Sequence, residues 1–256
     1  MKPLAILRMG STFAELARIH RDFVDWIAAG TGLPADQLTF IDAEGGAPLP
    51  APDRMRGAIL TGSHHWVTAG EPWSESVAAW LREAFYQKLP LLGICYGHQL
   101  IARALGGQVD FNPAGLEFGT VEITLAPGGS PAGVSPAGAT SAGNSCDPLI
   151  GILEPGVHAH TCHAQTVRQL PPGATLLAAS ARDAHQAFRV GECCWGVQFH
   201  PEFDETAARY YIDQYQAPLT EQGHDPKKLI ADLKPTPGSK GLLAAFASLT
   251  DPAASP

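Results

Sequence analysis

The chain has 256 residues, 45% of them hydrophobic, and its 17 basic and 25 acidic side chains give a formal net charge of −8. This length and apolar content suffice for one large α/β domain with a sizeable core. The sequence contains no run of Lys or Arg long enough to form an electrostatic footprint for phosphates, so we expect no nucleic acid partner.

The N-terminal segment MKPLAILRMG has an apolar stretch that is too short for a signal peptide. No other stretch approaches the roughly 18 uncharged apolar residues of a membrane span. The five cysteines are odd in number and lack a regular spacing, which favours reduced thiols over disulfides. We therefore expect a cytoplasmic protein that does not interact with membranes.

Strands and helices alternate in the first part of the chain. Residues 3–9 predict a strand, and apolar residues at helical spacing predict a helix from a capping box at Thr12–Glu15 to Gly30. Further elements are predicted as strands at 38–41 and 57–62, a helix at 74–88 and a buried strand at 89–94. Such alternation is typical of a parallel sheet with helices on both faces.

The second half of the chain has fewer helices. Its predicted strands are 121–125, 174–180, 185–190 and 194–199, and this succession favours hairpins or antiparallel additions to the sheet. Residues 126–145 are dense in Gly, Pro, Ala and Ser, and predict a mobile surface loop. Beyond Tyr215 the pattern is helical, so we expect a main domain at 1–215 and a C-terminal helical extension at 216–256.

The segment LLGICYGHQLI, residues 91–101, interrupts an apolar run with Gly93 and Gly97 on either side of Cys95. A strand, a tight turn with a nucleophile between small residues and then a helix form a nucleophile elbow, here G-x-C-x-G. The helix would direct its positive end at Cys95 and favour the thiolate, and free backbone N–H groups would receive an oxyanion. The alternative is a small, inert hydrophobic residue at the end of a strand.

The segment GVQFHPEF, residues 196–203, provides a candidate base. His200 follows a predicted strand, and Glu202 lies two residues further on, with Pro201 restricting the backbone between them. Glu202 would hold one imidazole nitrogen while the other faces Cys95, as catalysis by a thiolate requires. Taken alone, His200 is about as consistent with a hydrogen-bonded structural residue.

Together, LLGICYGHQLIARALGGQV and WGVQFHPEF resemble the motifs of the class I glutamine amidotransferases, in particular the glutaminase domain of GMP synthetase and its stand-alone relatives. Three further segments resemble parts of the same family: GAILTGS at 57–63, NPAGLEFG at 112–119 and HAQTVRQLP at 163–171. The resemblance implies a flavodoxin-like, three-layer α/β sandwich with a mostly parallel central sheet. Residues 1–215 would form the type 1 amidotransferase domain.

The resemblance also implies an activity. The chain would hydrolyse the side-chain amide of glutamine to glutamate and ammonia through a thioester on Cys95, with His200 transferring protons and Glu202 orienting it. The backbone N–H groups of Ser63 and Tyr96 would be the oxyanion donors. No cofactor is expected. The residues expected to hold the α-amino and α-carboxylate groups are Gln99, His163, Ala164 and Gln165.

Two features depart from GMP synthetases. The oxyanion segment has Thr61-Gly62-Ser63-His64 where they usually have Ser-Gly-Gly-Pro. The sequence also contains no synthetase domain, which leaves the acceptor of the ammonia unspecified; a synthetase partner subunit is one candidate. Two other functions use the same fold: a γ-glutamyl peptidase or hydrolase, and a catalytically silent regulatory binding protein. In the hydrolase, the segment His64-His65-Trp66 would border the leaving group.

The segment HAHTCH contains side chains that can bind zinc, namely His158, His160, Cys162 and His163. His158 and His160 would share one face of a strand, but the sequence offers no second cluster of ligands. We therefore interpret the segment as a strand and loop beside the substrate pocket and expect no metal.

Overall fold

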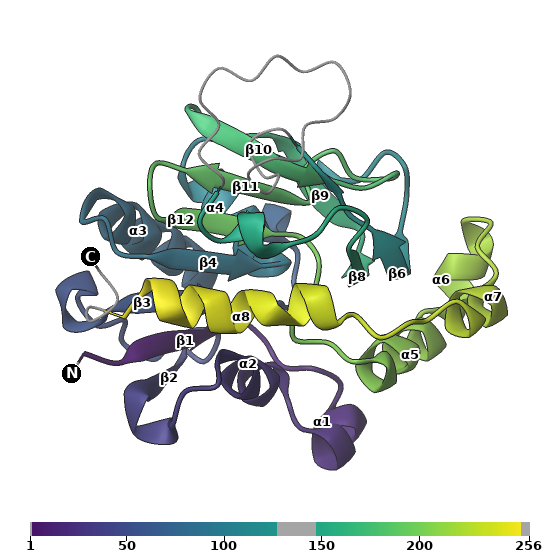
Figure 1. Cartoon of the computed structure of the whole chain (residues 1–256), viewed down its shortest axis with the longest axis horizontal. Helices are drawn as coiled ribbons and strands as arrows, with labels where there is room; N and C mark the ends of the chain where they lie inside the picture. The colour runs from purple at the N-terminus through teal and green to yellow at the C-terminus, as the bar shows by residue number, and fades with distance from the viewer. Residues whose placement is uncertain (1, 127–146, 252–256) are drawn as a thin grey trace.

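An eight-stranded sheet runs through the part of the chain that the computed structural model describes, residues 2–126 and 147–251 (Figure 1). The strand order is β2-β1-β3-β4-β12-β11-β10-β7. These strands are β1 (Leu4–Arg8), β2 (Leu38–Asp42), β3 (Gly57–Leu60), β4 (Leu91–Ile94), β7 (Thr124–Leu125), β10 (Ala174–Ala179), β11 (Ala187–Val190) and β12 (Cys194–Val197). Two smaller sheets pair β5 (Gln108–Phe111) with β9 (Gln165–Gln169), and β6 (Glu117–Glu122) with β8 (His158–His163).

The pairing of the strands changes once along the main sheet, from parallel to antiparallel. Strands β2, β1, β3, β4 and β12 are parallel, whereas β11, β10 and β7 continue the sheet in antiparallel pairs. Both the parallel first half and the antiparallel additions predicted from the sequence are thereby confirmed. Because β4 and β12 are parallel neighbours, their carboxyl ends bring the segment at Cys95 next to the segment at His200.

Helices cover both faces of the main sheet. The helices are α1 (Ala14–His20), α2 (Phe23–Thr31), α3 (Pro72–Tyr86), α4 (Tyr96–Ala104), α5 (Glu205–Gln214), α6 (Gln216–Glu221), α7 (Pro226–Ala231) and α8 (Pro237–Leu249). One face packs against α3 and α4 through residues such as Leu81 and Leu100, and the other against α2 and α8 through Ile27 and Phe246. Figure 1 shows α8 crossing one face of the sheet. The structure is therefore the expected three-layer α/β fold.

The first helix was predicted to be continuous up to Gly30, and this extent is wrong. The structure has two helices, because Arg21 adopts a left-handed φ of 71° that no α-helix tolerates. The capping box is at Asp22 and Asp25, at the start of α2. Thr12 instead shares a hydrogen bond of 2.9 Å with the hydroxyl of Tyr211, so a tertiary contact takes the place of the predicted cap.

Three further segments differ from the predictions or lie outside the structure. Residues 165–169, predicted as a loop, form β9 because their backbone pairs with β5. The single strand predicted at 121–125 is divided between β6 and β7, and the amide of Ile123 between them donates to the carbonyl of Val157. The loop predicted at 126–145 lies outside the described residues apart from Ala126.

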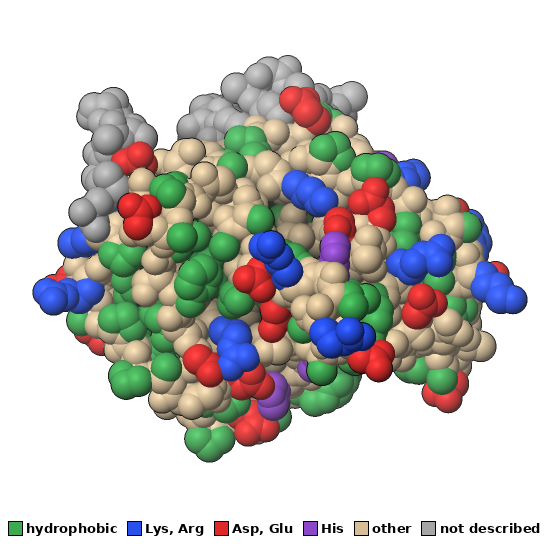
Figure 2. Space-filling view, turned by 90° about the horizontal axis from the view of Figure 1, so that it is seen from below, with side chains coloured by type: hydrophobic (Ala, Val, Ile, Leu, Met, Phe, Trp, Pro, Cys, Tyr) green, Lys and Arg blue, Asp and Glu red, His purple; other side chains and the backbone are tan. Residues whose placement is uncertain are grey.

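The C-terminal helices form two groups. Residues of α5 and α6, among them Tyr211 and Leu219, pack with Leu16 and Phe118 in a separate apolar cluster. Helix α8 instead completes the cover of the main sheet. The division of the chain at residue 215 stays a prediction. No helix in the described ranges is long and apolar enough to cross a membrane. Figure 2 shows acidic and basic side chains interspersed on one face of the molecule.

Candidate active site

Cys95 lies at the tip of a sharp turn between β4 and α4. Its backbone has φ 49° and ψ −98°, a combination that residues with a Cβ rarely adopt. Its amide donates to the carbonyl of Val197 at 2.8 Å, which fixes the turn to the neighbouring strand β12. The side chain is 7% exposed and borders a cavity. The structure thus has the geometry of the predicted elbow.

The two glycines of the elbow are required by close packing. A Cβ on Gly93 would lie 2.4 Å from the backbone of Gly97, and a Cβ on Gly97 would lie 2.7 Å from the carbonyl oxygen of Leu60. Larger residues would therefore push α4 away from β3 and β4. This close approach answers why the apolar run is interrupted on both sides of Cys95.

His200 and Glu202 lie beside Cys95. Nδ1 of His200 is 2.8 Å from Oε1 of Glu202, and both side chains are almost fully buried. Because a carboxylate only accepts hydrogen bonds, Nδ1 carries the hydrogen, and the other ring nitrogen is left for Cys95. The backbone amide of His200 donates to the carbonyl of His160 at 2.8 Å, which anchors the segment to β8.

The surroundings of His200 favour its charged form. Burial alone would lower its pKa, but the carboxylate of Glu202 and the side chain of Cys95 outweigh burial and raise the pKa to about 10. The ring also stacks on Phe203, with centroids 4.1 Å apart, and lies 6.4 Å from the ring of Phe23. The imidazole is therefore held in one orientation and is protonated at neutral pH.

The segment predicted to hold the oxyanion lies close to both Cys95 and His200. A Cβ on Gly62 would be 3.1 Å from Cε1 of His200 and 3.8 Å from Cβ of Cys95, so this loop passes directly over both. The hydroxyl of Ser63 accepts a hydrogen bond from the amide of His65 at 3.1 Å. The side chain that replaces the usual glycine of this loop therefore stabilises the loop itself.

Tyr96, the first residue of α4, directs its side chain away from Cys95. Its hydroxyl donates to Ser74 Oγ at 2.7 Å and its ring stacks on Trp73. Burial raises its pKa to about 12. At the elbow, Tyr96 therefore contributes its backbone N–H and not its side chain. The first turn of a helix leaves such N–H groups without intrahelical partners.

Gln99 and Gln165 line the same cavity as Cys95. Nε2 of Gln99 donates to the backbone oxygen of Gln165 at 2.8 Å and to Oε1 of Gln198 at 2.9 Å. Nε2 of Gln165 donates to the hydroxyl of Thr68 at 2.6 Å, while its buried Oε1 has no partner among the described residues. A buried acceptor without a partner is rare in folded proteins, which marks this oxygen as a candidate for binding a ligand.

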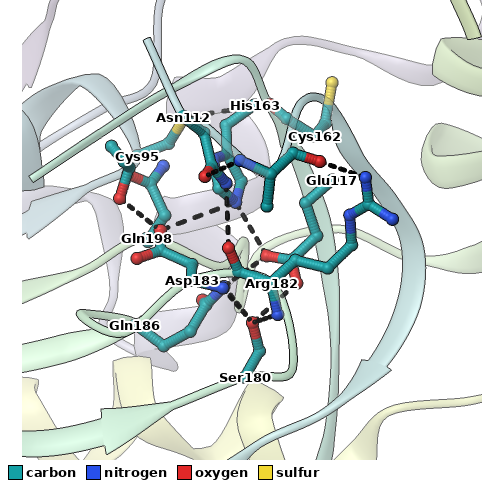
Figure 3. Close-up of polar contacts among 12 residues, drawn as sticks. Cys95, Asn112, Glu117, Cys162, His163, Ser180, Arg182, Asp183, Gln186 and Gln198 are labelled. Carbon is teal, nitrogen blue, oxygen red and sulfur yellow. Dashed lines mark hydrogen bonds and ion pairs between the residues drawn. The ribbon is translucent and has the colours of Figure 1, made fainter. Parts of the chain in front are cut away.

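His163 and Ala164 complete the predicted substrate segment. Both line the cavity, but the imidazole of His163 is engaged in a network behind it (Figure 3). Nδ1 is 3.0 Å from the backbone oxygen of Gln165, and Nε2 is 2.9 Å from Oε2 of Glu117. The carbonyl of Ala164 accepts from the amide of Asn112 at 2.8 Å. These contacts fix the backbone of 163–165.

Glu117 is a residue whose role the sequence did not reveal. Its carboxylate is 2% exposed and accepts from Ser180 Oγ at 2.6 Å and from Gln186 Nε2 at 2.5 Å, besides its contact with His163. Figure 3 shows these side chains converging on the carboxylate. A Glu between the apolar residues Leu116 and Phe118 was a signal of a buried, paired carboxylate.

Three other cysteines, Cys162, Cys193 and Cys194, lie in the described ranges. All four cysteines in residues 2–126 and 147–251 are free thiols. Burial raises the pKa of Cys162, Cys193 and Cys194, which disfavours their thiolates. In the same ranges, no group of three His, Cys, Asp or Glu side chains is arranged to hold a metal ion.

The fold and the candidate site together define an α/β protein with a cysteine elbow. A match to a family model identifies the protein family. The model of the class I glutamine amidotransferases matches residues 53–215, more than half of the chain. The chain belongs to this family.

Three curated relatives are named as γ-glutamyl peptidases or as GMP synthases. γ-Glutamyl peptidase 5 of Arabidopsis thaliana is 28% identical over 63% of this chain and 59% of its own length. A GMP synthase of Porphyromonas gingivalis is 34% identical over 58% of this chain and 25% of its own length. A glutamine-hydrolyzing GMP synthase subunit of Halobacterium salinarum is 30% identical over 65% of this chain and 76% of its own length. The chain thus spans less than two thirds of the first two relatives.

Solved structures agree on the fold. A glutamine amidotransferase of Thermotoga maritima superposes with a TM-score of 0.70 at 20% identity, covering 98% of both chains. One from Methylobacillus flagellatus gives a TM-score of 0.66 at 21% identity, covering 98% of this chain and 94% of the other. At these identities the likeness concerns the fold alone.

Proposed function

We propose that the chain hydrolyses the amide on the γ-carbon of a glutamyl group, with glutamine as the simplest substrate, through a thioester on Cys95. The observation that carries this proposal is the placement of His200, held by Glu202, beside a cysteine at the tip of an elbow. The family to which the chain belongs supports it. The products from glutamine would be glutamate and ammonia.

The proposed mechanism assigns one role to each group. The imidazolium of His200 and the N-terminal end of α4 stabilise a thiolate on Cys95, which attacks the γ-carbonyl carbon. Backbone N–H groups of Ser63 and Tyr96 stabilise the oxyanion. His200 then protonates the departing amine, takes a proton from water for hydrolysis of the thioester, and is oriented throughout by Glu202.

Substrate recognition is assigned to the end of the cavity at Gln99 and Gln165. The unpartnered Oε1 of Gln165 would accept from the α-amino group of the substrate. The backbone of 163–165 and the carboxamide of Gln99 would position the α-carboxylate. His163 acts here by holding this backbone in place, because its imidazole is committed to Glu117.

Two matched cysteine variants test the proposal. Glutamate release from glutamine and from γ-glutamyl amides is measured for the purified chain, for Cys95→Ala and for Cys193→Ala, the latter thiol lying outside the cavity. We expect turnover to be lost in Cys95→Ala alone. Absence of turnover with every substrate would favour a silent binding protein, and an active Cys95→Ala variant would refute the assigned nucleophile.

The second candidate is a γ-glutamyl peptidase, which the name and similarity of the Arabidopsis relative favour. The Halobacterium relative, named as one subunit of a GMP synthase, instead supports a synthetase partner that would consume ammonia. A peptidase needs no partner. Activity of the chain alone on a γ-glutamyl conjugate would therefore favour the peptidase over an amidotransferase that depends on a synthetase partner. A cytoplasmic location stays a prediction.

A further inference from the structure

Two groups of residues line the cavity at Cys95. The first contains Gln99 and Gln165, with the rings of Trp66 and Phe111 in contact, 5.3 Å apart. Phe111 is paired with Gln165 across β5 and β9, so these residues form one wall. Under the proposed function, this group holds the α-amino and α-carboxylate groups of the glutamyl part.

The second group consists of aromatic side chains from segments far apart in the sequence. We call it the aromatic lobe, and define it as Phe23, His64, Phe118, Tyr211 and Tyr215, all of which line the cavity. Its rings contact one another: the centroids are 5.6 Å apart for His64 and Tyr211, and 5.0 Å apart for Phe118 and Tyr215.

The leaving group must depart toward this lobe. The proposed proton donor to the departing amine is His200, whose ring lies 6.4 Å from that of Phe23 in the lobe. With the glutamyl part at Gln99 and Gln165, we place the amine nitrogen and its substituent on the side of His200. The residues of the lobe are therefore the ones that a substituent on the amine would touch.

The hydroxyl of Tyr211 and one ring nitrogen of His64 in the lobe are already engaged. The hydroxyl of Tyr211 makes hydrogen bonds of 2.9 Å with Thr12 Oγ1 and with Nε2 of His64. Both side chains are thereby fixed, and they present ring surface to the cavity. Burial also lowers the pKa of His64, which keeps its imidazole neutral at neutral pH.

Among the described residues that line the cavity, none is Asp, Glu, Lys or Arg. A cationic substituent on the amine would find no carboxylate there and would lie near the imidazolium of His200. A substituent with a carboxylate would find no cation besides His200, which is already paired with Glu202. Desolvating either charge without a partner is costly, so the lobe discriminates against both.

The cavity also has a substantial volume, about 300 Å³. At about 30 Å³ for each water in the liquid, this volume corresponds to roughly ten waters. The lobe lines part of it with apolar and aromatic surface, the kind of surface that stabilises a bound apolar group.

We propose that the amide cleaved at this site is the γ-glutamyl amide of an uncharged, apolar, ring-bearing amine whose ring sits in the aromatic lobe. This inference rests on the proposed function. The Cys95 sulfur forms a bond to the γ-carbon, the carbon–nitrogen bond breaks, and the proton of His200 goes to the amine nitrogen. Water then cleaves the carbon–sulfur bond, giving glutamate and returning a proton to His200.

The test compares substrates of nearly equal shape. These are γ-glutamyl benzylamide, its para-carboxylate analogue and its para-aminomethyl analogue, with glutamine as reference. We expect kcat/KM for the benzylamide to exceed that for each charged analogue, and that for glutamine, at least tenfold. Turnover of glutamine without preference for the benzylamide would overturn this inference and leave the proposed function standing. Absence of turnover with all four compounds would overturn both.

A charge placed in the lobe gives a gain-of-function test that misfolding cannot imitate. In Tyr215→Glu we expect the ratio of kcat/KM for the aminomethyl analogue to that for the benzylamide to rise at least tenfold. The control is Tyr86→Glu, because Tyr86 is 81% exposed on α3 and does not line the cavity. An unchanged ratio in a folded, active Tyr215→Glu variant, or an equal rise in the control, would overturn the assignment of the lobe.

Discussion

Replacing Cys95 by glycine should stabilise the protein relative to replacing it by alanine. Cys95 has φ 49° and ψ −98°, which glycine adopts without the steric conflict that a Cβ causes. Backbone strain of this kind costs about 1–3 kcal/mol. Glycine loses about 0.5–1 kcal/mol more conformational entropy on folding than alanine. Central values of about 2 and about 0.75 kcal/mol leave Cys95→Gly more stable than Cys95→Ala by about 1 kcal/mol.

Thermal and urea unfolding of both variants, followed by circular dichroism, measure this difference. For a chain of this size, 1 kcal/mol corresponds to about 2–4 °C in Tm. The matched control is Thr206, an exposed residue in the first turn of α5, where ordinary helix propensity applies. Thr206→Ala should be more stable than Thr206→Gly. If Cys95→Gly is instead less stable than Cys95→Ala, the elbow stores no backbone strain and the reasoning fails.

Three further predictions concern His200, Glu202 and Glu117. His200→Ala should lower kcat more than Glu202→Gln, because His200 transfers protons in both half-reactions and Glu202 only orients it; steady-state kinetics in the reverse order contradict these roles. Since proton donation needs the imidazolium and the pKa of His200 is raised to about 10, kcat/KM should fall on the alkaline side only as the pH approaches 10; a fall centred near pH 7 contradicts this. Glu117→Ala should lower the free energy of unfolding by about 2–6 kcal/mol, since it leaves two buried donors, on His163 and Gln186, without their acceptor at about 1–3 kcal/mol each, against about 1 kcal/mol for Ser180→Ala; equal urea midpoints argue against the network.

The sequence was sufficient to predict the architecture around Cys95. Short apolar runs separated by amphipathic helices specify a parallel sheet, and the spacing of Gly93, Cys95 and Gly97 specifies a turn that needs close packing. The sequence also predicted that His200 and Glu202 follow a strand, with Pro201 between them. Adjacent parallel strands then bring these two segments together, as the register of β4 and β12 shows.

Other features depend on contacts between distant segments. The break at Arg21 and the contact of Thr12 with Tyr211 have no local signal, because the partner is far away in the sequence. Strand β9 forms only because β5 lies beside it. The aromatic lobe likewise combines Phe23 from α2 with Tyr215 at the end of α5, so no single segment could reveal it.

The central claim, a thioester on Cys95, is tested most directly by mass spectrometry of the protein after acid quenching during turnover. Glutamine and γ-glutamyl benzylamide serve as substrates, and peptide mapping locates the adduct. We expect a single γ-glutamyl group on Cys95, absent from Cys95→Ala. An adduct on Cys162, Cys193 or Cys194, or turnover of substrate with no adduct on Cys95 at any quench time, would contradict the account.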